Sequence, residues 1–174
     1  HELEDAPGQQ AAEGAADHGD QGRLRQGAGQ DLGARGAAGD EQLGLGLAGV
    51  FVAGALVVRE VDWLADQVSS VMDFADEGSL PLLVAVTAVN GVAEELFFRG
   101  AAYAAVPRRP VVWTTLAYVV ATLATGNVML AFAAILLGVV VGLQRRASGG
   151  ILAPVLTHCT WSLTMLLALP PIFA

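Results

Sequence analysis

From residue 43 onward, hydrophobic residues form five long runs that short polar segments separate. The runs are too long for strands and carry almost no charge, which is typical of helices that cross a lipid bilayer. A full crossing takes about 20 residues, so one of the shorter runs can instead be re-entrant. The sequence therefore predicts an all-α, polytopic transmembrane helix bundle. Its apolar runs cover residues 43–58, 80–106, 111–124, 128–143 and 151–169.

An amphipathic segment lies between the first two runs. Its apolar residues recur every three or four positions, which places their side chains on one helical face. Such a helix lies on the membrane surface or packs across the bundle. The apolar face comprises Val61, Leu64, Val68, Val71, Met72 and Ala75, and Asp62, Asp66, Asp73 and Asp76 occupy the rest.

Charge divides the chain of 174 residues into two parts. Nine of the 17 acidic residues lie at or before Glu41, six lie between Glu60 and Glu77, and none follows Glu95. A soluble domain needs a polar surface, whereas a bilayer removes that need. Residues 1–42 have almost no large apolar side chains and cannot offset the entropy of folding. We therefore predict a disordered low-complexity tail over residues 1–42 and a helical membrane domain over residues 43–174.

The arginines predict how the helices are oriented, since cytoplasmic loops carry an excess of positive charge. The chain has nine arginines and no lysine. Pairs or groups of them precede the first run and follow the second and fourth runs, namely Arg23, Arg25 and Arg35, then Arg108 and Arg109, then Arg145 and Arg146. This pattern predicts a multi-pass membrane protein with a cytoplasmic N-terminus, and we expect its location to be the plasma membrane. A lipid bilayer is the expected partner, and no basic face suggests a nucleic acid.

Three acid–base residues inside the apolar runs are the candidates for chemistry, namely Glu94, Glu95 and His158. Charge at membrane depth costs about 2.5–3.5 kcal/mol on insertion scales and is by default functional. Arg99 follows Glu95 by one helical turn and can pair with it, whereas Glu94 projects about 100° away and stays free as a general acid or base. His158 and Ser162 share one helical face, so a carboxylate, an imidazole and a hydroxyl can line one cavity and hydrolyse an acyl bond.

Simpler roles for the same residues stay open. Glu95 and Arg99 can form a purely structural ion pair. Glu94 can be the coupling acid of a proton transporter, and Asn90, one turn earlier, can simply be its hydrogen-bond partner. His158 can do no more than hydrogen-bond a neighbouring helix.

The order of these residues resembles a known family. Residues 94–100 read Glu-Glu-Leu-Phe-Phe-Arg-Gly and match an EExxxR motif. Residues 149–158 look like the approach to a last motif, in which a histidine is followed four residues later by Asn or Asp. Over residues 80–169 the chain is similar to the CAAX-protease and bacteriocin-processing (CPBP, or Abi) family of intramembrane peptidases.

The resemblance implies roles for the matching positions. Glu94 corresponds to the glutamate that activates the hydrolytic water, and His158 to a histidine that helps form the oxyanion site. Glu95 and Arg99 correspond to the supporting pair. The implied substrate is a membrane-associated peptide or a prenylated protein. No cofactor is expected, because a Zn²⁺ site, the alternative, needs three or four ligands and Glu95 is expected to be committed to Arg99.

Two positions depart from the family pattern. The middle motif, FxxxH, falls on Tyr118 and Thr122, and Ser162 stands where the last motif has Asn or Asp. Threonine cannot act as a base near neutral pH, and the loss of a general acid or base costs ~10²–10⁴-fold in rate. The leading interpretation is an intramembrane endopeptidase. The alternatives are a catalytically impaired pseudo-peptidase, acting in peptide or lipid binding or bacteriocin self-immunity, and a proton-coupled transporter.

Overall fold

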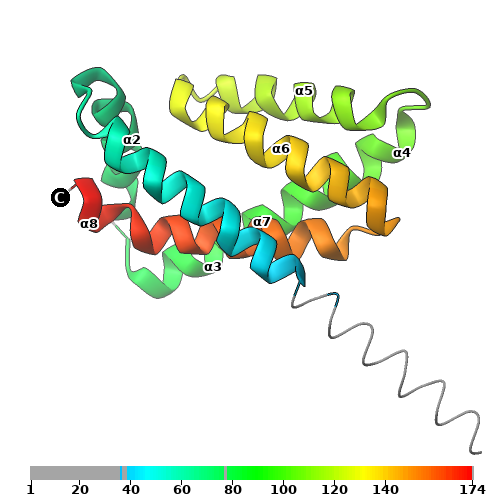
Figure 1. Cartoon of the computed structure of the whole chain (residues 1–174), viewed down its shortest axis with the longest axis horizontal. Helices are drawn as coiled ribbons and strands as arrows, with labels where there is room; N and C mark the ends of the chain where they lie inside the picture. Colours follow the sequence, from blue (N-terminus) through cyan, green and yellow to red (C-terminus); the bar gives the residue numbers. More distant parts are fainter. Residues whose placement is uncertain (1–35, 37–38, 77, 174) are drawn as a thin grey trace, which may run out of the picture. The chain divides into compact units, whose positions relative to one another are not determined.

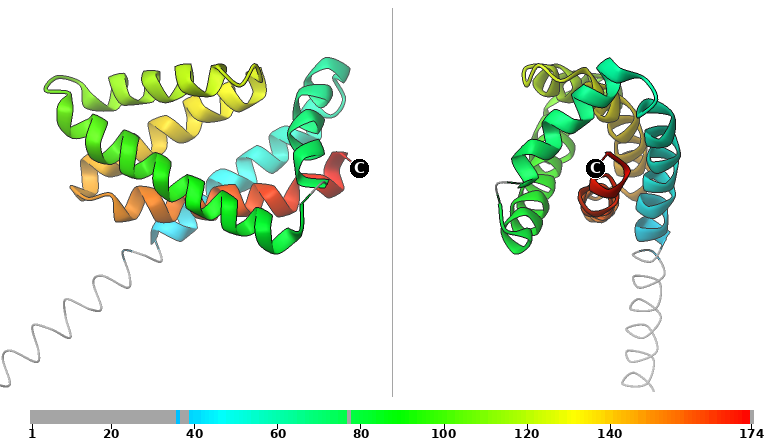
Figure 2. Two further views of the ribbon diagram at one scale, coloured as in Figure 1. Left: turned by 180° about the vertical axis from the view of Figure 1, so that it is seen from behind. Right: turned by 90° about the vertical axis from the view of Figure 1, so that its left-hand side faces the viewer.

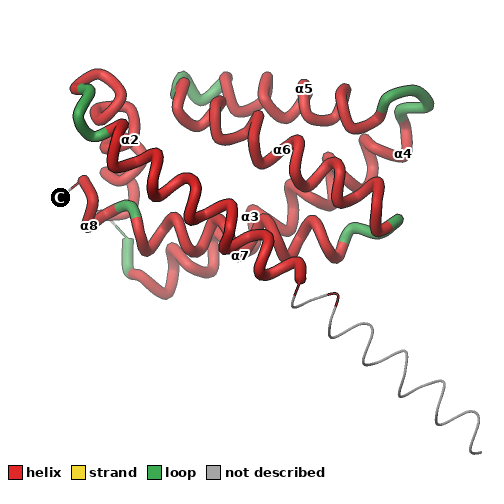
Figure 3. The backbone as a smooth tube through the Cα atoms, in the orientation of Figure 1, coloured by secondary structure: helices red, strands yellow, loops and turns green. Residues whose placement is uncertain are grey.

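Helices make up all of the regular secondary structure in the described part of the chain (Figure 3). The computed structural model describes residues 36, 39–76 and 78–173. The first helix begins at Gly39, before the predicted start at residue 43. Apart from residue 36 and the first turn of this helix, the predicted tail lies outside the described residues. The predicted all-α class is confirmed.

The five apolar runs correspond to four helices that are long and apolar enough to cross a membrane, and to one shorter apolar helix. The short helix is α5 (Pro110–Leu123), whose 14 residues rise only about 21 Å against a hydrocarbon core of ~30 Å. The chain is therefore a multi-pass membrane protein in which α5 is the span too short to cross alone. The four longer helices are Gly39–Val58, Leu80–Ala105, Val128–Ser148 and Leu152–Phe173.

Two of these long helices are composite. The second contains a π-helical segment, which the sequence did not predict, and the last bends where Pro170 and Pro171 follow each other, since proline cannot continue the hydrogen-bond ladder. The elements are α3 (Leu80–Glu95), the π-helix η1 (Leu96–Ala102), α4 (Tyr103–Ala105), α6 (Val128–Ser148), α7 (Leu152–Ala168) and α8 (Pro170–Phe173).

Polar and glycine residues set both ends of α6. Gly126 has a φ of +80° and Gly149 a φ of +69°, a left-handed conformation that glycine adopts without steric cost. The side chain of Asn127 accepts hydrogen bonds from the backbone N–H groups of Met129 and Leu130, at 3.0 Å each, and so caps the helix. The polar segment between the third and fourth apolar runs is therefore a turn followed by a helix cap.

The predicted amphipathic segment is α2 (Asp62–Asp76). Asp62 and Asp66 are exposed, whereas Val68 and Met72 are half-buried and line a cavity. The helix contacts α6 and α8 (Figure 1). The apolar face of α2 therefore packs against the bundle.

Helix α7 packs between the helix Gly39–Val58, called here the first span, and α3 (Figure 2). Glycines permit both approaches. A Cβ atom on Gly44 would lie 2.8 Å from the carbonyl oxygen of Thr157, and one on Gly91 would lie 3.2 Å from the Sγ of Cys159. Since small residues let helix backbones approach closely, these glycines set the position of α7 and of the histidine it carries.

The helix ends next to the pairs Arg108–Arg109 and Arg145–Arg146 lie at one end of the bundle. The start of the first span, the α4–α5 connection and the α6–α7 connection are all at this end (Figure 1). Asp40 joins the first span to α7 and α6, because its carbonyl accepts a hydrogen bond from Thr157 Oγ1 at 2.9 Å and its carboxylate accepts one from Gln144 Nε2. The arrangement is the one that the arginine pattern requires. The arginines before the first span lie outside the described residues.

Candidate active site

Glu95 and Arg99 form a fully buried ion pair. Both side chains are 0% exposed, and Arg99 Nη1 donates to Glu95 Oε1 at 3.0 Å. The guanidinium also lies over the ring of Tyr118, 4.9 Å from its centroid, a cation–π contact. The pair predicted from the spacing is confirmed. Together with Glu94, Tyr118 and His158 it forms a group of side chains called here the polar cluster.

Arg99 lies in the π-helical segment η1. Such segments are rare and frequently mark functional sites. Arg145 of α6 donates from Nε to the backbone carbonyl of Arg99 at 2.9 Å, and its guanidinium lies over the ring of Tyr103 at 5.0 Å. From the sequence, Arg145 indicates only how the helices are oriented. The structure shows that it also holds η1 against α6.

Gly138 of α6 lets the guanidinium reach the neighbouring helix. Its carbonyl accepts hydrogen bonds from Arg99 Nη2 at 3.3 Å and from Thr115 Oγ1 at 3.0 Å. A Cβ atom at this position would lie 2.9 Å from Thr115 Cγ2 and 3.4 Å from Arg99 Nη2. Sequence reasoning missed both Gly138 and Thr115. The available signal was a small residue in the middle of an apolar helix.

Alanine at position 138 should therefore strain the cluster. We expect Gly138→Ala to be less stable than Gly46→Ala by about 1–3 kcal/mol, the usual cost of overpacking. Gly46, in the first span, is the matched control, because a Cβ added at this residue meets nothing within 4 Å and reports helix propensity alone. The free energy of unfolding in mixed detergent micelles measures the difference. Equal stability of the two variants would contradict the close packing at Gly138.

His158 links the ion pair to the second glutamate. Its Nδ1 lies 2.7 Å from Glu95 Oε1, and its Nε2 lies 3.8 Å from Glu94 Oε2. With Nδ1 donating to Glu95, Nε2 is the nitrogen that faces Glu94. A separation of 3.8 Å is too long for a direct hydrogen bond, so Nε2 stays available to a molecule in the site. The buried carboxylate of Glu95 therefore orients the imidazole.

Glu94 is the accessible member of the glutamate pair. Its side chain is 27% exposed, whereas that of Glu95 is 0% exposed. Oε1 of Glu94 accepts a hydrogen bond from Asn90 Nδ2 at 2.7 Å, and Oε2 faces His158. The predicted geometry, with one glutamate paired to arginine and the other directed elsewhere, is what the structure shows.

A cavity of about 370 Å³, called here the polar cavity, brings together the remaining candidates from α3, α5 and α7. The hydroxyl of Thr122 donates to the carbonyl of Tyr118 in its own helix at 2.9 Å, so the backbone already engages it. Cys159, by contrast, is only a half-buried free thiol. The polar cavity is lined by Asn90, Glu94, Tyr118, Thr122, His158, Trp161 and Ser162, together with apolar side chains.

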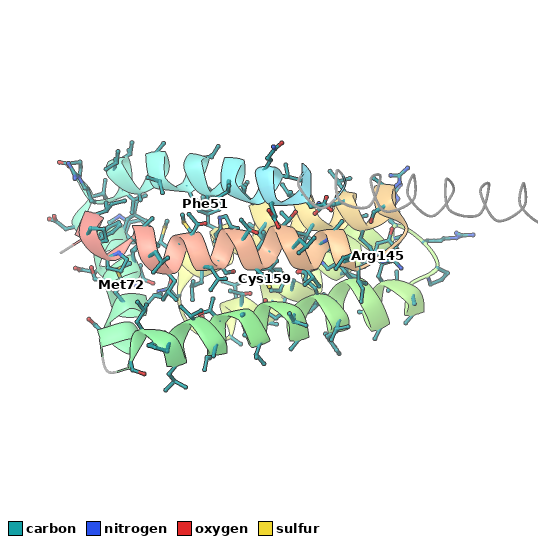
Figure 4. The ribbon with its side chains drawn as sticks, turned by 90° about the horizontal axis from the view of Figure 1, so that it is seen from below. Phe51, Met72, Arg145 and Cys159 are labelled. Atoms are coloured by element: carbon teal, nitrogen blue, oxygen red, sulfur yellow. The ribbon has the colours of Figure 1, made fainter. Side chains whose placement is uncertain are left out.

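A larger cavity of about 580 Å³ adjoins the polar one and is called here the apolar cavity. Its walls come from the first span, α2, α3, α6 and α7, and they include Phe51 and Met72, which Figure 4 labels. The ring of Phe51 packs on Trp161 with 5.0 Å between centroids. The two cavities share Asn90, Leu130, Ala133, His158, Trp161 and Ser162. An apolar group in the larger cavity therefore lies next to the polar cluster.

The donor set does not fit zinc. Within residues 39–76 and 78–173 no group of three or more His, Cys, Asp and Glu side chains is placed to hold a metal ion. Glu95 Oε1 is already shared by Arg99 and His158, and Glu95 does not line the polar cavity. Glu94 and the histidine Nε2 are therefore the two donors of this kind on the cavity wall. A catalytic zinc site uses three protein ligands.

Comparison with protein families shows which family the chain is related to. The profile of the type II CAAX prenyl endopeptidase Rce1-like family matches residues 76–164, just over half of the chain. The chain belongs to the Rce1-like family. The matched range contains every predicted site residue, from Glu94 to Ser162, so the Rce1-like segment and the polar cluster coincide. No curated protein and no solved structure matches the chain. At the level of the family, the chain is thus of the CAAX-type intramembrane protease class.

Proposed function

We propose that the chain is an intramembrane endopeptidase that hydrolyses membrane-associated peptides with a water activated by Glu94. One observation carries the proposal. Glu94 Oε2 and His158 Nε2 lie 3.8 Å apart on the wall of one cavity, and neither is engaged by the buried Glu95–Arg99 pair. A base and a donor at this spacing can act on the same bound carbonyl.

The reaction needs two steps. In the first, Glu94 Oε2 takes a proton from a water while the water oxygen bonds to the scissile carbonyl carbon. The carbonyl oxygen becomes an oxyanion, which an N–H of His158 stabilises. In the second step the carbonyl re-forms, the C–N bond breaks, and Glu94 returns its proton to the leaving amine. The products are a carboxylic acid and an amine, and Glu94 is a carboxylate again.

Charge balance supports this assignment of protons. An imidazole that donates to Glu95 through Nδ1 and to an oxyanion through Nε2 is an imidazolium. In the tetrahedral intermediate the imidazolium and Arg99 offset the Glu95 carboxylate and the oxyanion, because Glu94 then carries the proton taken from the water. A neutral cluster is the least costly arrangement at membrane depth. In this mechanism Glu95 and Arg99 hold the histidine, and Ser162 is a second donor on the same wall.

The substrate class follows from the adjoining cavities. We propose a peptide or protein that carries a prenyl or similar apolar chain, with the chain in the apolar cavity and the scissile bond in the polar cavity. The shared walls at Trp161 and Ser162 keep the two parts of such a substrate next to each other. We further propose the plasma membrane as the location, with the arginine-rich end and the N-terminus on the cytoplasmic side.

Cleavage of prenylated and unprenylated forms of a quenched fluorescent peptide panel, with the protein in lipid bicelles, tests the proposal. We expect the prenylated forms to be cleaved faster, and mass spectrometry of the products to show one hydrolysed peptide bond. A folded protein that cleaves none of the peptides would count against hydrolysis. Cleavage without preference for prenylated forms would count against the proposed substrate class.

A second candidate function, binding without turnover, is motivated by Thr122. This residue occupies the position expected for a histidine, and its hydroxyl is bound to its own helix. A pseudo-peptidase would still hold peptide or lipid in the same cavities, for instance to confer bacteriocin self-immunity. Family membership favours both of these readings over the proton-coupled transporter.

The variant Thr122→His separates the two candidates. An imidazole at this position lines the polar cavity and adds an acid–base group, so we expect a gain of about tenfold in cleavage rate, below the ~10²-fold of an evolved general acid. Thr122→Val is the matched control and should leave the rate unchanged. Single-turnover cleavage in bicelles gives both rates. Activity that appears only in Thr122→His would make binding the native function, and a loss of rate in Thr122→Val would show that the native hydroxyl takes part.

A further inference from the structure

Asn90 is a polar residue of the site that neither the motif nor the mechanism above uses. We propose that its side-chain amide is a further active-site group, which orients Glu94 and donates a hydrogen bond to the reacting carbonyl. The inference rests on the proposed function and extends it to a residue one helical turn before the EExxxR motif at positions 94–99.

The first observation is the hydrogen bond to the catalytic glutamate. Asn90 Nδ2 donates to Glu94 Oε1 at 2.7 Å, which leaves Oε2 as the oxygen that faces His158. A carboxylate with one oxygen held in this way presents the other in a fixed direction, and fixed geometry is what general-base catalysis requires. Asn90 therefore decides which oxygen of Glu94 acts as the base.

The second observation is that the amide has a donor to spare. A primary amide carries two N–H groups, and within the described residues the Asn90 side chain makes one hydrogen bond, to Glu94. The residue lines both the polar and the apolar cavity. The second N–H is thus at the junction where a substrate with an apolar chain would place its scissile carbonyl.

A structural role does not account for Asn90. Asn127 joins the α5–α6 turn to α2 and Thr115 joins α5 to α6, whereas the hydroxyls of Thr122 and Thr164 satisfy themselves on a backbone carbonyl of their own helix. The hydrogen bond of Asn90 stays within α3 and reaches only Glu94. An amide in an otherwise apolar helix is costly, and polar residues at membrane depth mark functional sites by default.

Ser162 explains why the chain would place an amide on α3. The resemblance to the peptidase family expects Asn or Asp at position 162, and this chain has a serine there. Asn90 and Ser162 line the same two cavities from α3 and α7. The amide that is missing from one wall is therefore supplied from another.

The test uses Asn90→Ala, Ser162→Asn and the double variant in bicelles, with Val89→Ala as the matched control. Val89 lies on α3 next to Asn90, is 69% exposed and lines neither cavity. We expect Asn90→Ala to lower kcat by about 10²-fold, the usual cost of one oxyanion donor, with KM unchanged. The double variant should recover part of that loss, because Ser162→Asn returns an amide to the site.

A tetrahedral phosphinate analogue of the same peptide gives a readout that does not depend on turnover. Asn90→Ala should weaken its binding by about 10²-fold while leaving the affinity for the uncleaved peptide unchanged. Equal affinities in the wild type and Asn90→Ala, a rise in KM alone, or no recovery in the double variant would each overturn the inference. If Glu94→Gln cleaved the peptide as fast as the wild type, the proposed function would be overturned instead. The two failures are therefore distinct.

Discussion

Glu94→Gln is expected to lower the rate of peptide cleavage by at least ~10³-fold, toward the upper limit for the loss of a general base. Glutamine has almost the shape of glutamate, and its carbonyl oxygen can still accept the hydrogen bond from Asn90 that Glu94 accepts at 2.7 Å. It cannot take a proton from water. The expected loss is therefore one of chemistry, with the affinity for an uncleaved prenylated peptide unchanged.

Single-turnover cleavage in bicelles measures this effect, and binding of the same peptide measures affinity. Glu60→Gln is the matched control, because Glu60 lies at an exposed turn and is 69% exposed. Its rate should equal that of the wild type. If Glu94→Gln cleaved as fast as Glu60→Gln, the activated water would have to come from another group, and the mechanism proposed for Glu94 would be wrong.

Arg99→Met is expected to destabilise the folded protein by about 3–5 kcal/mol, the cost of removing one partner from a buried ion pair. The variant leaves the carboxylate of Glu95 at 0% exposure with His158 as its one remaining partner. It also removes the hydrogen bond to Gly138 and the contact with the ring of Tyr118. The cost is large because no water in the bilayer can solvate the carboxylate of Glu95 once Arg99 is removed.

The exposed pair of Arg59 and Glu60 provides the control for Arg99→Met. Their side chains are 47% and 69% exposed, so Arg59→Met should change stability by only ~0–1 kcal/mol. The double variant Glu95→Gln with Arg99→Met should be more stable than Arg99→Met alone, because no charge is left unpaired. Unfolding in mixed detergent micelles measures all of these. A small effect of Arg99→Met would show that the pair contributes little to folding.

The predictable part of the site depended on contacts within one helix. The spacing of Glu95 and Arg99 predicted their ion pair, and the spacing of Asn90 and Glu94 allowed the hydrogen bond that the structure contains. Both contacts span four residues, so helical geometry alone brings the side chains together. The same reasoning could not find the contact between His158 and Glu95, which are 63 residues apart.

Contacts between helices depend on how each helix is rotated and how closely it approaches its neighbour. Gly44, Gly91 and Gly138 decide this here, since a side chain at any of them would collide with the facing helix. The π-helical turn of η1 adds a further local rotation, and Arg145 stabilises it from α6. The sequence shows the glycines but not which helix each of them faces, and the π-helical turn has no sequence pattern of its own. Both depend on side chains that meet only in the folded bundle.

The sequence by itself determined that this is a multi-pass helical membrane protein, because a bilayer alone tolerates so long an apolar stretch without charge. It also determined which ionisable groups lie at membrane depth, and therefore where function should be sought. The tertiary structure decided which of the two glutamates is buried against Arg99 and His158 and which faces a cavity. Helical periodicity places two neighbouring acids on adjacent faces, but only the packing of α7 against α3 and of α6 against η1 determines what each face meets.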